Sequence, residues 1–203
     1  QPLPATTALG RTPVLRAPQL LGDWVLWLEQ RPHEKGRTTA LIRRWGEAKS
    51  TPLELTPAPI NLRSRVHDYG GAALTATLTK GTLQLVWVDD NDCCLWSQAW
   101  TGLKGASAQS LQAIEASPQR LTCPSDSALG GGVIDPSSSR WLGVMEEAGC
   151  DRLVSVALDQ HDQVPVVVHQ PADFAGYLAL SSDGAQLAWV EWQQPSMPWD
   201  CSQ

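Results

Sequence analysis

The chain has 203 residues, a mass of 22.0 kDa and a formal net charge of −6. Hydrophobic residues make up 42% and charged residues 18%, a composition typical of a folded globular protein rather than a disordered one. The acidic balance argues against a nucleic-acid surface, which needs clustered Lys and Arg. No run approaches the roughly 20 apolar residues that a membrane-spanning helix requires, so we expect neither nucleic acid nor a membrane as partner.

Short strand-like runs dominate the sequence, and Gly, Pro, Asp, Asn and Ser separate them with the residues that turns need. Only "ASAQSLQAIEA" (106–116) has a helical look, and its apolar spacing is weak. The 10 tryptophans lie mostly in or beside the strand-like runs, where large flat side chains suit packed sheet faces. The predicted strands are 24–30, 38–45, 72–78, 82–88, 93–100, 131–134, 140–147, 152–159, 164–169, 177–181 and 186–192.

Two segments recur along the chain at fixed spacings. "GGVIDPSSSRWLGVMEE" and "YLALSSDGAQLAWVEW" superpose as strand, turn and strand, with Ile134 matching Leu180 at an offset of 46. A Leu-Thr-x-Pro ending also recurs, with Leu55 matching Leu121 at an offset of 66. Because two different positions within a unit recur, the sequence predicts a repeat architecture.

The repeat unit has an inner hairpin, a third strand and a short outer strand that ends in a proline-containing loop. Units of about 40 to 55 residues with four antiparallel strands are typical of β-propeller blades. A two-sheet sandwich also has many short strands but does not require a repeat, so we favour the propeller. The predicted blades are 15–59, 72–124 with an insertion from Gly102 to Ala116, 129–170, and 176–203.

The fourth predicted blade stops after two strands. We therefore interpret the fold as all-β, an incomplete propeller of about three and a half blades out of a probable seven, at the front of a longer protein. A cut blade leaves a sheet edge and an apolar face open. We expect the isolated chain to associate with itself unless a partner covers that face.

The five cysteines are odd in number and irregularly spaced. This pattern favours reduced thiols in a cytoplasmic protein over a disulfide framework. We expect no cofactor and no metal. The "DDND" string (89–92) resembles part of a calcium loop, but Cys93 and Cys94 follow where further ligands would stand, which favours a solvated turn.

Three stretches of the chain form recognisable motifs: "WLEQRPHEKGRTTALIRR" (27–44), "LTPAPINLRSRVHDYGGAAL" (55–74) and "SSDGAQLAWVEWQQPSMPWD" (181–200). They resemble the N-terminal β-propeller of the prolyl oligopeptidase family of serine peptidases, in the branch of acylaminoacyl peptidases and dipeptidyl aminopeptidases. The sequence departs from the family pattern at three positions. Asp68 replaces the family's usual Glu, Ala72 replaces a third glycine, and Ser182 replaces the turn proline.

The resemblance implies a seven-bladed propeller that caps an α/β-hydrolase domain with a Ser, Asp and His triad. Such a triad needs a serine on a G-x-S-x-G turn, and "GASAQ" (105–109) lacks the second glycine. The chain therefore contains no predicted catalytic residue, and we expect it to be inactive by itself. Its predicted partners are short peptide substrates and a C-terminal hydrolase domain in cis.

Two strings hold candidate residues for substrate gating or for the domain interface. In "RVHDYGG" the candidates are Arg65, His67, Asp68 and Tyr69, which combine a cation, an imidazole, a carboxylate and a phenol. They could hold a peptide terminus by charge-assisted hydrogen bonds, or simply form a structural loop.

In "QQPSMPWD" (193–200) the candidates are Met197, Trp199 and Asp200, on a loop between strands. Met197 and Trp199 could contact substrate or pack between blades.

The sequence thus predicts the propeller region of a serine oligopeptidase that gates access of short peptides to the hydrolase domain. The alternative is a non-catalytic propeller that binds a protein or peptide, because a fold does not fix a function.

Overall fold

The computed structural model describes residues 12–47, 51–67, 71–103, 111–115 and 117–202. These residues form strands joined by turns, with a single-turn 3₁₀ helix (Pro32–Glu34). The predicted all-β propeller fold, with four-stranded antiparallel blades, is confirmed. The strands are β1 (Val14–Leu21), β2 (Trp24–Arg31), β3 (Arg37–Arg44), β4 (Leu53–Glu54), β5 (Leu74–Thr79), β6 (Thr82–Val88), β7 (Leu95–Thr101), β8 (Gln112–Ala113), β9 (Gln119–Thr122), β10 (Ser127–Asp135), β11 (Arg140–Glu147), β12 (Cys150–Ala157), β13 (Val166–His169), β14 (Phe174–Leu180) and β15 (Leu187–Trp192).

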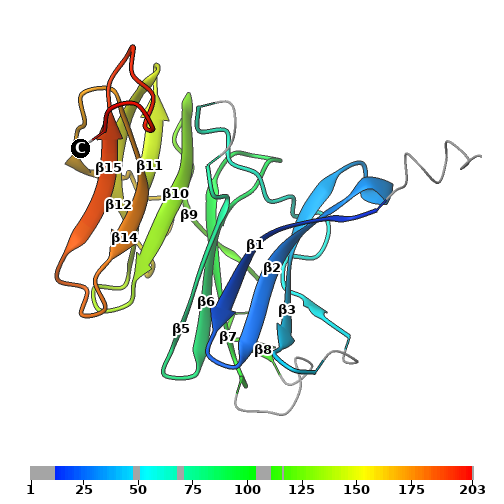
Figure 1. The fold of residues 1–203 in the computed structure, drawn as a ribbon. Helices are drawn as coiled ribbons and strands as arrows, with labels where there is room; N and C mark the ends of the chain where they lie inside the picture. The colour runs from blue at the N-terminus through cyan, green and yellow to red at the C-terminus, as the bar shows by residue number, and fades with distance from the viewer. Residues whose placement is uncertain (1–11, 48–50, 68–70, 104–110, 116, 203) are drawn as a thin grey trace, which may run out of the picture.

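The strands form four antiparallel sheets that follow one another along the chain (Figure 1). The first has the order β1-β2-β3-β4 and the third the order β10-β11-β12-β13. The second has the order β5-β6-β7, followed by β8 and β9, which pair with different parts of β7. In the described residues the fourth sheet has two strands, β14 and β15. Neighbouring strands are antiparallel and consecutive in the chain, except that β9 pairs with β7 after the intervening β8.

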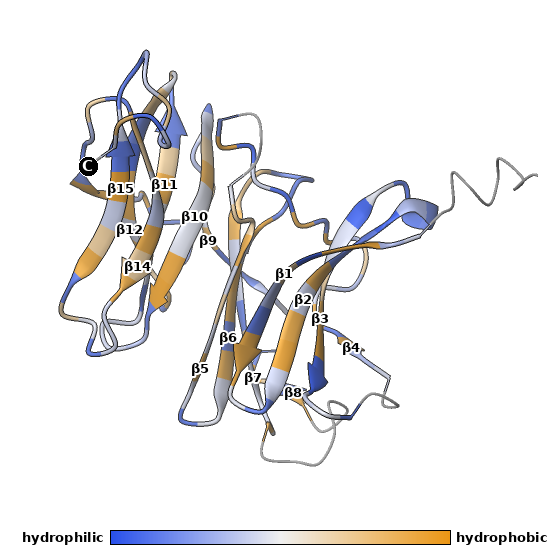
Figure 2. Ribbon diagram, in the orientation of Figure 1, coloured by the Kyte–Doolittle hydropathy of each residue, from blue (hydrophilic) through white to orange (hydrophobic). Residues whose placement is uncertain are grey.

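Apolar side chains from consecutive sheets form a separate core at each junction. Strand β6 shows why, because its side chains alternate between two faces. Leu83, Leu85 and Trp87 pack toward the first sheet, whereas Val86 and Val88 pack toward the third. The hydrophobic residues lie mainly along the strands, and the loops are mostly hydrophilic (Figure 2). A third core joins the third and fourth sheets through Val66, Val144, Leu153 and Ala175.

The first strands of three sheets carry a β-bulge. Register shifts occur in β1 between Arg16 and Gln19, in β10 between Gly130 and Val133, and in β14 between Gly176 and Ala179. A residue in each bulge has a positive φ: Ala17 (47°), Gly131 (61°) and Tyr177 (57°). Gly131 and Tyr177 are separated by the same offset of 46 as the sequence repeat, so the repeat extends to backbone conformation.

Two glycines make room for Trp141, whose side chain is 2% exposed. A Cβ built on Gly132 or on Gly143 would lie 2.2 Å or 2.1 Å from atoms of the indole ring. The ring therefore lies over Gly132 of β10 and Gly143 of β11, and neither position has space for a side chain.

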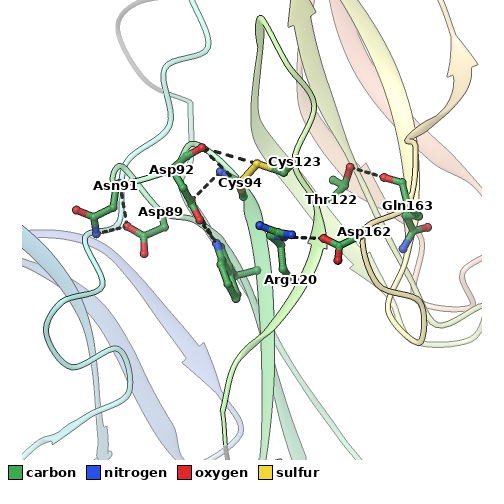
Figure 3. Close-up of a disulfide and its surroundings, with 10 residues drawn as sticks. Asp89, Asn91, Asp92, Cys94, Arg120, Thr122, Cys123, Asp162 and Gln163 are labelled. Carbon is green, nitrogen blue, oxygen red and sulfur yellow. Dashed lines mark hydrogen bonds and ion pairs between the residues drawn. A yellow bond between two sulfur atoms is a disulfide. The ribbon is translucent and has the colours of Figure 1, made fainter.

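In the segment 106–116, the described residues include β8, which pairs with Trp100 and Thr101 of β7, in keeping with the all-β prediction. The expectation of reduced thiols is wrong for two of the five cysteines. The structure pairs Cys94 with Cys123 in a disulfide, with the two Cα atoms 4.3 Å apart (Figure 3). Cys94 directly precedes β7 and Cys123 directly follows β9, and these antiparallel strands bring together two residues that lie 29 positions apart. Cys93, Cys150 and Cys201 are free thiols.

Within the described residues, we find no helix with the length and apolar character needed to cross a membrane.

Candidate functional site

The segment that joins the first two sheets carries the "RVHDYGG" string and lies in the seam between blades. Its side chains alternate, with Leu62, Ser64 and Val66 buried and Arg63 and Arg65 exposed. The Ser64 hydroxyl donates to the carbonyl of Leu129 in the third sheet over 2.8 Å. The alternation therefore anchors the segment on one side and presents its cations on the other.

Arg65 forms an ion pair with the turn that follows β6. Its guanidinium lies 2.9 Å from a carboxylate oxygen of Asp90, and its side chain is 56% exposed. The acidic side chains of this turn serve as hydrogen-bond acceptors. Asp89 accepts from the backbone N–H groups of Asn61 and Asn91, and Asp92 accepts from the N–H of Cys94. Burial raises the pKa of Asp89. Figure 3 shows this turn beside the disulfide.

His67 forms a contact that spans two further blades. Its Nε2 lies 2.8 Å and 2.9 Å from the two carboxylate oxygens of Asp151, which stands in β12 with no exposed surface. The same carboxylate accepts the N–H of Ala175 in β14 over 2.8 Å. The hydrogen bond that His67 donates to Asp151 raises the pKa of His67, because the carboxylate favours the imidazolium. We call His67 and Asp151 the inter-blade clamp.

Aromatic rings surround the imidazole. Phe174 meets it edge-on with ring centroids 5.3 Å apart, and Trp192 lies at 6.2 Å. Trp192 also stacks on Phe174 and approaches Tyr177, which is 73% exposed. Together with glycines of β10 and β14, His67, Tyr177 and Trp192 line a cavity of about 440 Å³, which we call the aromatic cavity. It presents apolar surface beside a titratable group.

His67, Glu146 and Asp151 also present ligand atoms within 4.8 Å of one another, a spacing that could hold a metal ion. However, each group already has a protein partner. Asp151 receives two donors, and Glu146 accepts the backbone N–H of His67. The arrangement therefore acts as a hydrogen-bonded clamp that ties the connecting segment to the third and fourth sheets.

The other candidates lie apart from the clamp. Met197 and Asp200 hold a turn after β15, in which the Asp200 carboxylate accepts the Met197 N–H over 3.2 Å. Trp199 is 76% exposed and Met197 44% exposed, so neither is packed between blades in the described part of the chain. Asp68 and Tyr69 lie outside the described residues.

The sequence did not single out Glu146, Asp151, Phe174, Tyr177 or Trp192 as site residues. Asp151 carried the one usable signal, because it is the one acidic residue in the strand "CDRLVSVA". Its partner His67 is 84 residues away, and no local pattern links the two.

The "WLEQRPHEKGR" motif forms an ion-pair network at one end of the first sheet. Arg31 contacts Glu29 at 2.8 Å and both Glu34 and Glu54 at 3.1 Å. Arg37 contacts Glu54 at 2.6 Å and donates to two backbone carbonyls of the loop after β4. This network fastens the β2–β3 connection onto β4, so the motif stabilises the blade.

Comparisons with solved structures find peptidases. Over 93% of its length the chain is similar to 29% of a Mycobacterium tuberculosis puromycin-hydrolyzing peptidase, with 27% identity and a TM-score of 0.75. Over 94% of its length it is similar to 29% of puromycin hydrolase, with 28% identity and a TM-score of 0.71. A mutant of puromycin hydrolase complexed with PGG gives 28% identity and a TM-score of 0.69 over the same shares. The chain thus spans 29% of the length of these structures. No family model and no curated protein matches it.

Proposed function

We propose that this chain is the N-terminal propeller region of a serine oligopeptidase or aminopeptidase of the prolyl oligopeptidase family, in the acylaminoacyl and dipeptidyl peptidase branch. The observation that carries the proposal is the likeness to puromycin-hydrolyzing peptidases, which covers 93% of the chain at 27% identity. The three motif stretches of the sequence support the same family. By this proposal the catalytic serine, aspartate and histidine lie in a C-terminal hydrolase domain of the same protein.

The proposed role of the propeller is a steric gate. Each junction between consecutive sheets has its own apolar core. Because such cores are close-packed, the blades form a rigid wall. A rigid wall admits short, flexible peptides and excludes folded proteins. The inter-blade clamp and the aromatic cavity are the proposed contact points for peptides that pass along the blades.

The test uses the full-length protein with a fluorogenic acyl-amino-acid or dipeptide substrate and a serine-directed fluorophosphonate. We expect turnover, in which the substrate acyl group passes to the serine with release of the amine and then passes from the serine to water. In a separate reaction we expect the fluorophosphonate to label that serine and stop turnover. Residues 1–203 alone serve as the control and are expected to show neither. Peptide binding by the full-length protein without turnover or labelling would instead support a non-catalytic binding propeller.

The compartment proposed from the cysteine pattern is the cytoplasm, and the Cys94–Cys123 bond counts against it because disulfides persist mainly in oxidising compartments. Alkylation of free thiols in intact cells, followed by peptide mapping without reductant, distinguishes a cytoplasmic protein from an exported one. Alkylated Cys94 and Cys123 support the cytoplasm, and an intact bond supports an exported protein.

A further inference from the structure

A second hollow lies next to the aromatic cavity, between β1 and the segment that joins the first two sheets. Its volume is about 660 Å³, and its lining includes Arg16 of β1, Lys35 of the β2–β3 connection and Arg63 of the joining segment. All three cations are exposed. We call this hollow the cationic cavity.

The charges of the cationic cavity are not balanced within the described part of the chain. Asp90 is the one acidic residue in its lining, and Arg65 and Asn61 already bind the Asp90 carboxylate at 2.9 Å and 3.2 Å. Arg16, Lys35 and Arg63 form no ion pair with another described residue. Three unpaired cations in one hollow stand out in a chain whose formal net charge is −6.

The position of the cationic cavity relates it to the proposed peptide path. Gly71 and Ala72 line both the cationic and the aromatic cavity, so the two hollows adjoin. The Ala72 carbonyl accepts the N–H of Gly131 in the β10 bulge over 3.0 Å, which fixes the boundary between them. A ligand could therefore place an anionic group among the cations and an apolar side chain beside His67 and Trp192.

We propose that the cationic cavity binds a carboxylate of the peptide ligand, through Arg16 and Arg63 with Lys35 adding positive charge. Arginine suits this task because its planar guanidinium matches a carboxylate with two parallel hydrogen bonds. The carboxylate comes either from the free C-terminus or from an acidic side chain. This inference rests on the proposed peptide function and adds the ligand class to it.

The test measures binding to full-length protein that has been inactivated with the fluorophosphonate, so that hydrolysis does not interfere. The probes are three tetrapeptides that carry a fluorophore on the N-terminal amine: an all-alanine free acid, the same peptide as a C-terminal amide, and that amide with one internal Glu. We expect the free acid or the Glu-containing amide to bind about tenfold more tightly than the plain amide at low salt. The preferred probe identifies the source of the carboxylate, and added salt should weaken its binding.

Two variants and a matched control link the preference to the cavity. Arg16→Gln and Arg63→Gln should each reduce the preference for the carboxylate, whereas Lys80→Gln should preserve it. Lys80 is an exposed cation in the β5–β6 turn and lies outside the cavity lining. Its substitution therefore removes one positive charge, as the arginine substitutions do, without changing the cavity. Equal binding of all three probes, or a preference that survives in both arginine variants, would overturn the inference. Serine labelling tests the proposed peptidase function, whereas the preference among the probes tests the carboxylate site. Because the two readouts are separate, a failure of one proposal can be told apart from a failure of the other.

Discussion

Asp151 is a fully buried carboxylate that stands in a β-strand, and such a charge is costly unless it has partners. His67 and the N–H of Ala175 supply them. Both donors come from outside the strand that bears Asp151, so the buried charge is satisfied only when the third sheet, the fourth sheet and the joining segment are in place. A single residue thereby makes the packing of three segments interdependent.

The clamp should make stability depend on pH. Because the folded-state pKa of His67 is raised above its unfolded value, its stabilisation is complete below about pH 6.5 and is lost as pH rises through the folded pKa. We expect His67→Gln to destabilise the protein more at pH 5.5 than at pH 8.5, as measured by urea unfolding. The carboxylates with lowered pKa values, such as Asp135 at about 2, titrate below this window.

His33→Gln is the control for this prediction, because the His33 side chain is 54% exposed. It should leave the free energy of unfolding within about 0.5 kcal/mol of the parent. A cost of His67→Gln that is the same at both pH values would show that Asp151 does not hold a charged imidazole.

Gly143 offers a second test at the level of one residue. A Cβ at this position would lie 2.1 Å from the Trp141 ring, so Gly143→Ala should lower the free energy of unfolding by about 1–3 kcal/mol through overpacking. Gly176→Ala is the matched control, because its Cβ would lie 3.5 Å from Trp192, an ordinary contact. Equal unfolding midpoints in urea for the two variants would contradict the placement of Trp141.

At the scale of elements, the sequence predicted the strands well where alternation and turn residues coincide. The run "TLQLVWV" (82–88) became β6, and "RWLGVMEE" (140–147) became β11, each with the predicted bounds. Strand β1 was not among the predicted strands, since most of its residues are exposed and its bulge interrupts the alternation. The weak helical look of 106–116 gave no helix in its described part, where two residues pair with the edge of β7.

The contacts of the candidate site were harder to predict than the strands. His67 and Asp151 meet only because the segment that joins the first two sheets also contacts the third sheet. Cys94 and Cys123 likewise meet because β9 pairs with β7 in one particular register. Contacts of this kind depend on how sheets stack and on the register of their strands. A repeat pattern in the sequence gives the order of the strands, but it does not say which distant side chains meet.

The disulfide should stabilise the second sheet. It closes a loop of 29 residues in the unfolded chain, which corresponds to a loss of about 3 kcal/mol when the bond is removed. Cys123→Ser should therefore shift urea unfolding to lower concentrations under non-reducing conditions. Cys150→Ser, which removes an exposed free thiol, is the control and should change little. If dithiothreitol leaves the midpoint of the parent protein unchanged, the bond does not form in solution.

At the scale of the whole molecule, the apolar cores lie between sheets rather than inside them. Each blade is therefore stabilised mainly by its neighbours, as in other repeat proteins. Strand β13 is the outer strand of the third sheet, and it presents exposed valines at an edge where another chain could pair. Val164 just before it is 84% exposed, and Val166, Val167 and Val168 are 63%, 47% and 46% exposed.

These features predict that isolated residues 1–203 associate at micromolar concentrations, as measured by light scattering after size-exclusion chromatography. Val166→Lys should weaken the association, because a charge on an edge strand opposes pairing with another chain. Gln160→Lys adds the same charge at an exposed position outside β13 and should not. A monomer at all concentrations would contradict this prediction.

We propose that these sheets are consecutive blades of a propeller that belongs to a serine peptidase. An experimental structure of the full-length protein is the decisive measurement. We expect a ring in which these four sheets are the first blades, in chain order, above a hydrolase domain with a Ser, Asp and His triad. Two facing sheets, or a closed barrel made from these strands, would contradict it.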